Sequence, residues 1–95
     1  MPGRASVSGA EEQALAQARA AHAAHGEALL RKANVVGVGV GRRRRRGIET
    51  DEVALVVLVT RKQPLAALAP DDRIPRRLEG VAVDVREVGD LQAGF

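Results

Sequence analysis

Hydrophobic residues alternate with glycine along one stretch near the middle of the chain, and a second hydrophobic run follows it closely. Residues 36–40 read Val-Gly-Val-Gly-Val, and residues 53–59 are all valine, leucine or alanine. Alternation with a period of two and a high content of β-branched residues are both typical of β-strands. The dipeptide Arg46-Gly47 lies between the two runs and predicts a two-residue turn, with Gly47 at a positive φ. The pattern therefore predicts a β-hairpin.

A hairpin that closes at Arg46-Gly47 has a register that side-chain chemistry can check. This register sets five pairs opposite each other: Arg44 and Glu49, Arg42 and Asp51, Val40 and Val53, Val38 and Leu55, and Val36 and Val57. Opposite charges then face each other near the tip, and apolar side chains face each other further down. Each such pair is worth roughly 0.2–1 kcal/mol, so the charge match supports the hairpin prediction.

The segments on either side of the hairpin predict one helix and one further strand. Ser8 and Glu11 fit a capping box, and the chain from there to about Lys32 is rich in alanine, which favours a helix. After the hairpin, residues 81–86 read Val-Ala-Val-Asp-Val-Arg, an alternation that predicts a third strand.

These elements predict an α+β fold with a single domain. One long N-terminal helix is expected to pack on a three-stranded, mainly antiparallel sheet with a central β-hairpin. The domain is expected to span residues 8–88, with a disordered tail at 1–7 and a C-terminal tail at 89–95.

The two faces of the predicted sheet differ, and the difference suggests an assembly surface. Gly37, Gly39 and Gly41 share one face, where a smooth surface would accept the alanine-rich helix. The other face would stay exposed, and an exposed apolar patch of this kind usually marks a protein interface. The expected interface residues are Val38, Val40, Val53, Leu55 and Val57. The leading hypothesis is therefore a non-enzymatic structural module that self-assembles through this face or through sheet edges, as a homo-oligomer or a filament.

A run of arginine at the predicted hairpin tip supports a second hypothesis. The run consists of Arg42, Arg43, Arg44, Arg45 and Arg46. Arginine gives bidentate, salt-dependent contacts with phosphate, so the tip is a candidate site for nucleic acid or another polyanion, or for charge pairs across a subunit interface. The alternative is a solvated tip in which Arg42 and Arg44 pair with Asp51 and Glu49. No Tyr or Trp is present to stack bases.

The chemistry that the chain lacks also narrows its function. The 95 residues carry a net charge of +3 and no cysteine, which excludes disulfides and thiolate metal sites. His22 and His25 lie three residues apart without an evident third ligand, so a pH-sensitive contact is favoured over a metal site. We predict no catalytic residue, cofactor or metal. Because no signal peptide or membrane span is visible, a cytoplasmic protein without a membrane partner is expected.

Four short motifs occur in order along most of the chain: NVVGVGVG at residues 34–41, VTRKQP at 59–64, DRIP at 72–75 and GVAVDV at 80–85. As a set they resemble the short region that precedes the peptidase domain in some bacterial trypsin-like serine proteases, over about residues 24–88. The resemblance implies a small accessory module that regulates a separate serine peptidase. Since the chain ends where the peptidase domain would begin, the resemblance assigns no catalytic residue.

Overall fold

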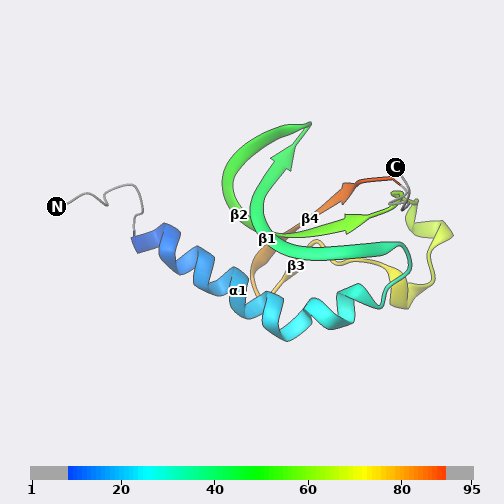
Figure 1. Cartoon of the computed structure of the whole chain (residues 1–95), viewed down its shortest axis with the longest axis horizontal. Helices are drawn as coiled ribbons and strands as arrows, with labels where there is room; N and C mark the ends of the chain where they lie inside the picture. Colours follow the sequence, from blue (N-terminus) through cyan, green and yellow to red (C-terminus); the bar gives the residue numbers. More distant parts are fainter. Residues whose placement is uncertain (1–8, 90–95) are drawn as a thin grey trace, which may run out of the picture.

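A helix and a sheet form two layers in the computed structural model, which describes residues 9–89 (Figure 1). The elements in chain order are α1 (Gly9–Leu30), β1 (Val35–Arg45), β2 (Ile48–Val59), the 3-10 turns η2 (Leu65–Ala67) and η3 (Pro70–Asp72), β3 (Arg77–Leu78) and β4 (Val81–Glu87). The predicted α+β class with one helix and a β-hairpin is confirmed. The predicted tail at 1–7, the capping Ser8, and residues 90–95 of the second tail lie outside the described residues.

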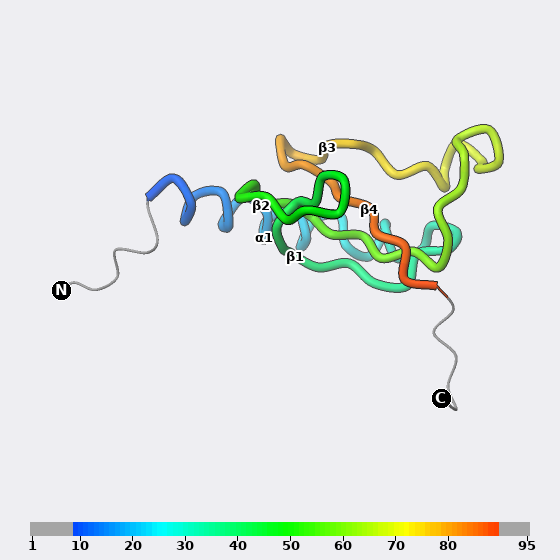
Figure 2. Tube along the Cα trace, turned by 90° about the horizontal axis from the view of Figure 1, so that it is seen from above, coloured from blue at the N-terminus to red at the C-terminus, as the bar shows by residue number. Residues whose placement is uncertain are grey.

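The sheet has four strands in the order β1-β2-β4-β3 and mixes parallel with antiparallel pairs. β1 and β2 are antiparallel, β2 and β4 are parallel, and the two-residue β3 is antiparallel to β4. The predicted sheet of three mainly antiparallel strands is wrong in these details. Parallel neighbours need a crossover connection. Figure 2 shows this connection leaving the end of β2 and running back beside the sheet to β3 before β4 begins.

Helix α1 covers the valine face of the sheet, not the glycine face. Ala18, Ala21 and Leu29 of the helix form one buried cluster with Leu55 and Val57 of β2. Burial of apolar surface stabilises by about 25 cal/mol per Å², so the helix gains more against valine and leucine than against glycine. The prediction that the helix packs on the glycine face, and that the valine face stays exposed, is therefore wrong.

The glycine face is covered by the hairpin itself, which curls over the side of the sheet opposite the helix (Figure 1). Ala54, Val56 and Ala82 belong to this face and are buried, although no helix within residues 9–89 lies there. A Cβ atom added at Gly41 would lie 3.1 Å from a methyl group of Val56, and one at Gly37 would lie 3.2 Å from Leu58. The small residues thus permit the tight curl, which explains glycine inside a strand.

The hairpin turn is where the sequence predicts it, but the register changes behind the turn. Gly47 has the expected positive φ of 80°, Arg46 shares the left-handed region at 54°, and Arg44 pairs with Glu49. An irregularity then follows, in which residues 50–52 of β2 stand opposite Arg43 alone.

Beyond this bulge the observed partners are Arg42 with Val53, Val40 with Leu55, and Val38 with Val57. These partners lie two residues from the predicted ones. A shift of two residues keeps every side chain on its face of the sheet. The residues predicted to share a face therefore do so, but the predicted cross-strand pairs are wrong. The bulge also bends the strand, which contributes to the curl.

Candidate protein-interaction site

The most open part of the sheet is the outer side of β4. Strand β3 pairs only with Val81 and Ala82, and the N–H of Val83 donates to the carbonyl oxygen of Arg76 at 2.9 Å. The N–H of Val88 instead points to β2, where it donates to Val59 at 2.8 Å. Because backbone groups alternate in direction along a strand, the N–H of Val85 points outward like that of Val83. Among residues 9–89 no strand pairs with this side beyond Val83, and we name it the β4 edge.

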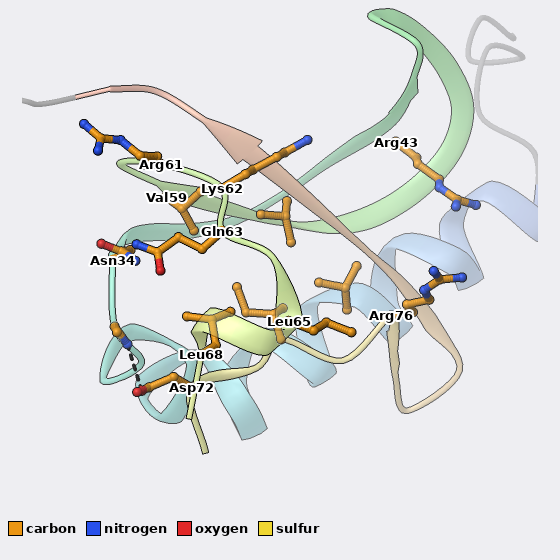
Figure 3. Close-up of a pocket in the computed structure, with 14 residues that line it drawn as sticks. Asn34, Arg43, Val59, Arg61, Lys62, Gln63, Leu65, Leu68, Asp72 and Arg76 are labelled. Atoms are coloured by element: carbon orange, nitrogen blue, oxygen red, sulfur yellow. Dashed lines mark hydrogen bonds between the residues drawn. The ribbon is translucent and has the colours of Figure 1, made fainter. Parts of the chain in front are cut away.

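A groove of about 480 Å³ lies beside the β4 edge (Figure 3). Its apolar lining comes from two strands and from the crossover connection: Val59, Leu65, Leu68, Ile74, Val83 and Val85. Leu65 is 62% exposed and adds apolar surface at the mouth of the groove. A volume of this size accommodates a few side chains, so the groove suits a segment of chain rather than a folded domain.

Four cations lie around the groove: Arg43, Arg61, Lys62 and Arg76. Figure 3 shows Arg43 and Arg76 on one side and Arg61 on the other, with the side chain of Lys62 extending between them. The one acidic residue that lines the groove is Asp72, and its carboxylate accepts a hydrogen bond from the N–H of Ala33 at 2.9 Å. The side chains of Arg61, Lys62 and Arg76 form no ion pair with any residue in 9–89. The groove therefore combines an apolar lining with three cations that have no acidic partner within the described residues.

Each residue of the expected assembly interface lies in the core or at its margin. Leu55 and Val57 have 0% exposure, and Val38, Val40 and Val53 are partly buried against the same cluster. Helix α1 therefore occupies the surface that the sequence assigns to a second copy. The physical reason is that β2 is apolar on both faces, so its pattern does not say which face remains free.

The arginine run divides into paired and unpaired side chains. Arg42 pairs with Glu11 at 3.0 Å and with Asp51 at 3.4 Å, the second of which the sequence predicts. Arg43 pairs with Glu52 at 3.0 Å, a contact that is not among the predicted pairs. The guanidinium groups of Arg44, Arg45 and Arg46 form no ion pair within the described chain, so the predicted pairing of Arg44 with Glu49 is absent there.

Glu52 contacts two cations, Arg43 in the same hairpin and Arg77 in β3. Its Oε1 lies 3.0 Å from Arg43 Nη1, and its Oε2 lies 3.4 Å from Arg77 Nη2. The hydrogen bond from Arg43 is the main reason that the pKa of Glu52 lies below its usual value of 4.5, and the charges of both arginines act in the same direction. Burial opposes this lowering of the pKa.

Side chains cap the outer edge of β1, which sets it apart from the β4 edge. Nε2 of His22 lies 3.1 Å from the carbonyl oxygen of Val38 and within hydrogen-bonding distance. Asp84 accepts the N–H of Arg44 at 2.9 Å, and the guanidinium group of Arg86 donates to the carbonyl oxygen of Arg42. These contacts occupy backbone groups that an added strand would need.

The two histidines serve separate contacts and do not converge. His22 contacts β1, while His25 Nε2 lies 2.9 Å from a carboxylate oxygen of Glu79, in the turn between β3 and β4. Within residues 9–89 no group of three or more His, Cys, Asp or Glu side chains could hold a metal ion. In the same part of the chain, no helix is both long enough and apolar enough to span a membrane.

Sequence reasoning misses the groove because its members come from separate segments. Arg61 and Lys62 follow β2, whereas Arg76 precedes β3, and only the crossover brings them together. One signal was available: cations stand at both ends of an apolar connection that contains the exposed Leu65.

Comparison with known proteins corrects the resemblance drawn from the sequence motifs. A family described as the NARROW LEAF 1 N-terminal domain matches residues 12–88, which is most of the chain. No curated protein matches it. The expected identity as an accessory region of bacterial trypsin-like serine proteases is thereby overturned. The peptidase partner rested only on that resemblance and therefore loses its support. The chain belongs to the NARROW LEAF 1 N-terminal domain family.

Proposed function

We propose that the chain is a non-enzymatic protein-interaction module that assembles with partner chains by strand addition at the β4 edge. The observation that carries the proposal is the unpaired side of β4 beyond Val83, next to an apolar groove. In strand addition, main-chain hydrogen bonds provide affinity and neighbouring pockets provide specificity. The β4 edge and the groove supply these two parts side by side.

Self-assembly is one form of this proposal. An antiparallel pair of β4 strands centred on Val85 would set Asp84 of one copy opposite Arg86 of the other. Opposite charges across a strand pair are favourable. Such a contact uses the same patch on both copies and closes as a dimer, so this form gives a homo-oligomer and not a filament.

The exchange of backbone amides with solvent tests the β4 edge directly. In dilute protein, the amide of Val85 should exchange at least about tenfold faster than those of Asp84 and Arg86, which face β2. Asp84 and Arg86 are internal controls, because they belong to the same strand. Protection of Val85 that appears on raising the concentration, together with a doubled mass in light scattering, would indicate self-assembly. Protection of Val85 in the dilute monomer would refute the proposal.

A second candidate function is the binding of nucleic acid or another polyanion by the hairpin tip. It is favoured by the guanidinium groups of Arg44, Arg45 and Arg46, which project without an acidic partner in the described chain. Replacement of all three by Ser should then lower the salt concentration that elutes the protein from heparin. The matched control replaces Arg19, Arg31 and Arg73 by Ser, which removes equal charge elsewhere. Equal elution of the two variants would leave only a net-charge effect and would refute a site at the tip.

A further inference from the structure

We infer that the groove beside the β4 edge selects an extended apolar segment of another protein with acidic residues at its ends. The inference rests on the proposed function, and it adds the chemical class of the partner. It is carried by the apolar lining and by the positive rim of the groove.

The apolar lining fits one face of an extended segment. Side chains in a strand point alternately to its two faces, so a segment added to β4 would present every second side chain to the groove. Val83 and Val85 line the groove from β4, and Leu65 lines it from the crossover connection. Apolar side chains that enter the groove would cover Leu65, which is otherwise mostly in water.

The positive charge around the groove favours acidic residues in the segment that binds there. Lys62 and Arg76 line the groove from different segments (Figure 3), and neither side chain has an acidic partner within residues 9–89. The nearby carboxylate of Glu87 already accepts the backbone N–H of Lys62 at 3.0 Å. Acidic side chains at the rim would therefore meet cations that no described residue neutralises, which favours binding and its specificity.

A second copy of the chain matches this groove less well than an acidic segment does. From Val83 to Glu87 the strand β4 carries two acidic residues and Arg86, so its charges almost cancel. Nucleic acid also fits poorly, because no aromatic side chain lines the groove to stack a base. The partner that fits both the lining and the rim is an acidic, extended polypeptide.

Binding of labelled synthetic peptides to the full chain tests the inference. The three probes are fluorescein-labelled octapeptides in which Val alternates with Thr and both end residues are Glu, Thr or Lys; we call them the Val-Glu, Val-Thr and Val-Lys probes. Their binding is followed by fluorescence anisotropy at low salt. We expect the Val-Glu probe to bind at least about tenfold more tightly than the Val-Thr probe, and the Val-Lys probe not to bind up to about 1 mM.

Charge reversal in the groove localises the binding. The double variant Lys62→Glu, Arg76→Glu should bind the Val-Glu probe about tenfold more weakly. The matched control Arg19→Glu, Arg31→Glu has the same net charge, and both of its positions are exposed on or just after α1. It should bind like the unaltered chain. Circular dichroism verifies that each variant is folded, and equal weakening in the two variants would overturn the assignment to the groove.

Methylation of the probe backbone separates the inference from the proposed function. A strand that pairs on one side uses the N–H groups of alternate residues. One of two isomers of the Val-Glu probe, N-methylated either on every Val or on every Thr, should therefore bind like the parent, and the other should lose binding. Equal binding of the isomers would overturn strand addition. If the Val-Thr probe binds as tightly as the Val-Glu probe, strand addition is supported and the selection of acidic residues is refuted. If neither probe binds, both proposals are refuted.

Discussion

The carboxylate of Asp84 in β4 accepts a hydrogen bond from the backbone N–H of Arg44 in β1, with 2.9 Å between Oδ2 and the nitrogen. The two strands are not neighbours in the sheet, because β2 lies between them. The contact exists since the hairpin curls far enough for its tip to reach over β4. Arg86 strengthens it, with Nε 3.0 Å from the same carboxylate oxygen. Asp84 thus fastens the curled tip to the rest of the sheet.

Replacement of Asp84 by Ala should therefore destabilise the fold. The side chain is only 11% exposed, and its loss would leave the N–H of Arg44 and the side chain of Arg86 without this acceptor. We expect the free energy of unfolding in urea to fall by about 1–3 kcal/mol. The control is Asp51→Ala, an exposed carboxylate at the same tip, which should leave the urea midpoint unchanged. Equal midpoints for the two variants would contradict the fastening role of Asp84.

The glycines of β1 give a second prediction, in which two neighbouring sites should respond differently. A Cβ at Gly39 meets no atom within 4 Å, whereas one at Gly41 lies 3.1 Å from Cγ2 of Val56. Replacement of Gly by Ala at a compatible site stabilises by about 0.4–1 kcal/mol through the unfolded chain. Gly39→Ala should therefore raise the free energy of unfolding. The free energy of unfolding of the Gly41→Ala protein should be at least about 1 kcal/mol lower than that of the Gly39→Ala protein. The measurement is the midpoint of chemical denaturation of each variant. A Gly41→Ala protein that is as stable as the Gly39→Ala protein would contradict the tight curl.

A third prediction concerns the two leucines that distinguish the covered surface from the open one. Leu55 has 0% exposure beneath α1, whereas Leu65 is 62% exposed in the groove. Leu55→Asp should unfold the chain, because an unpaired charge in the core costs more than about 4 kcal/mol. Leu65→Asp should stay folded and should lose the Val-Glu probe instead. Circular dichroism and anisotropy on both variants provide the measurement, and a folded Leu55→Asp protein would mean that the valine face is open after all.

The sequence predicts the elements of the fold better than it predicts how they meet. The alternation in residues 36–40 and the run in 53–59 identify the hairpin strands, and alanine identifies α1. The side on which α1 packs is not encoded in this pattern, because Val56 and Leu58 make the second face of β2 as apolar as the first. The curl of the hairpin decides on which face of the sheet α1 packs. The bulge opposite Arg43 bends the hairpin, and no pattern in the sequence marks this bulge.

The groove was harder to predict than the fold for a related reason. Its cations Lys62 and Arg76 come together only because β4 lies parallel to β2, which requires a crossover. The alternation at residues 81–86 indicates a strand but carries no information on its direction. The two-residue β3, which leaves most of the β4 edge uncovered, is too short for any periodicity to reveal.

Glu52 provides the last prediction, a dependence of stability on pH. Arg43 donates a hydrogen bond to this carboxylate and holds its pKa below 4.5 in the folded chain. A carboxyl group with a lowered folded pKa adds stability above its unfolded pKa, and the gain is lost as the pH falls through the folded value. The effect is modest, because the side chain is 40% exposed and water screens the pair.

The stability difference between the unaltered chain and Glu52→Gln should thus be largest near neutral pH and should shrink as the pH falls through the lowered pKa of Glu52. Carbon NMR of the carboxyl group should also show the pKa of Glu52 rising toward 4.5 in Arg43→Gln, and rising less in Arg77→Gln, because the hydrogen bond from Arg43 is the main cause of the lowering and the second contact is longer at 3.4 Å. An unchanged pKa in Arg43→Gln would mean that the pair does not form in solution. The link between the bulge and β3 would then rest on the longer contact between Glu52 and Arg77.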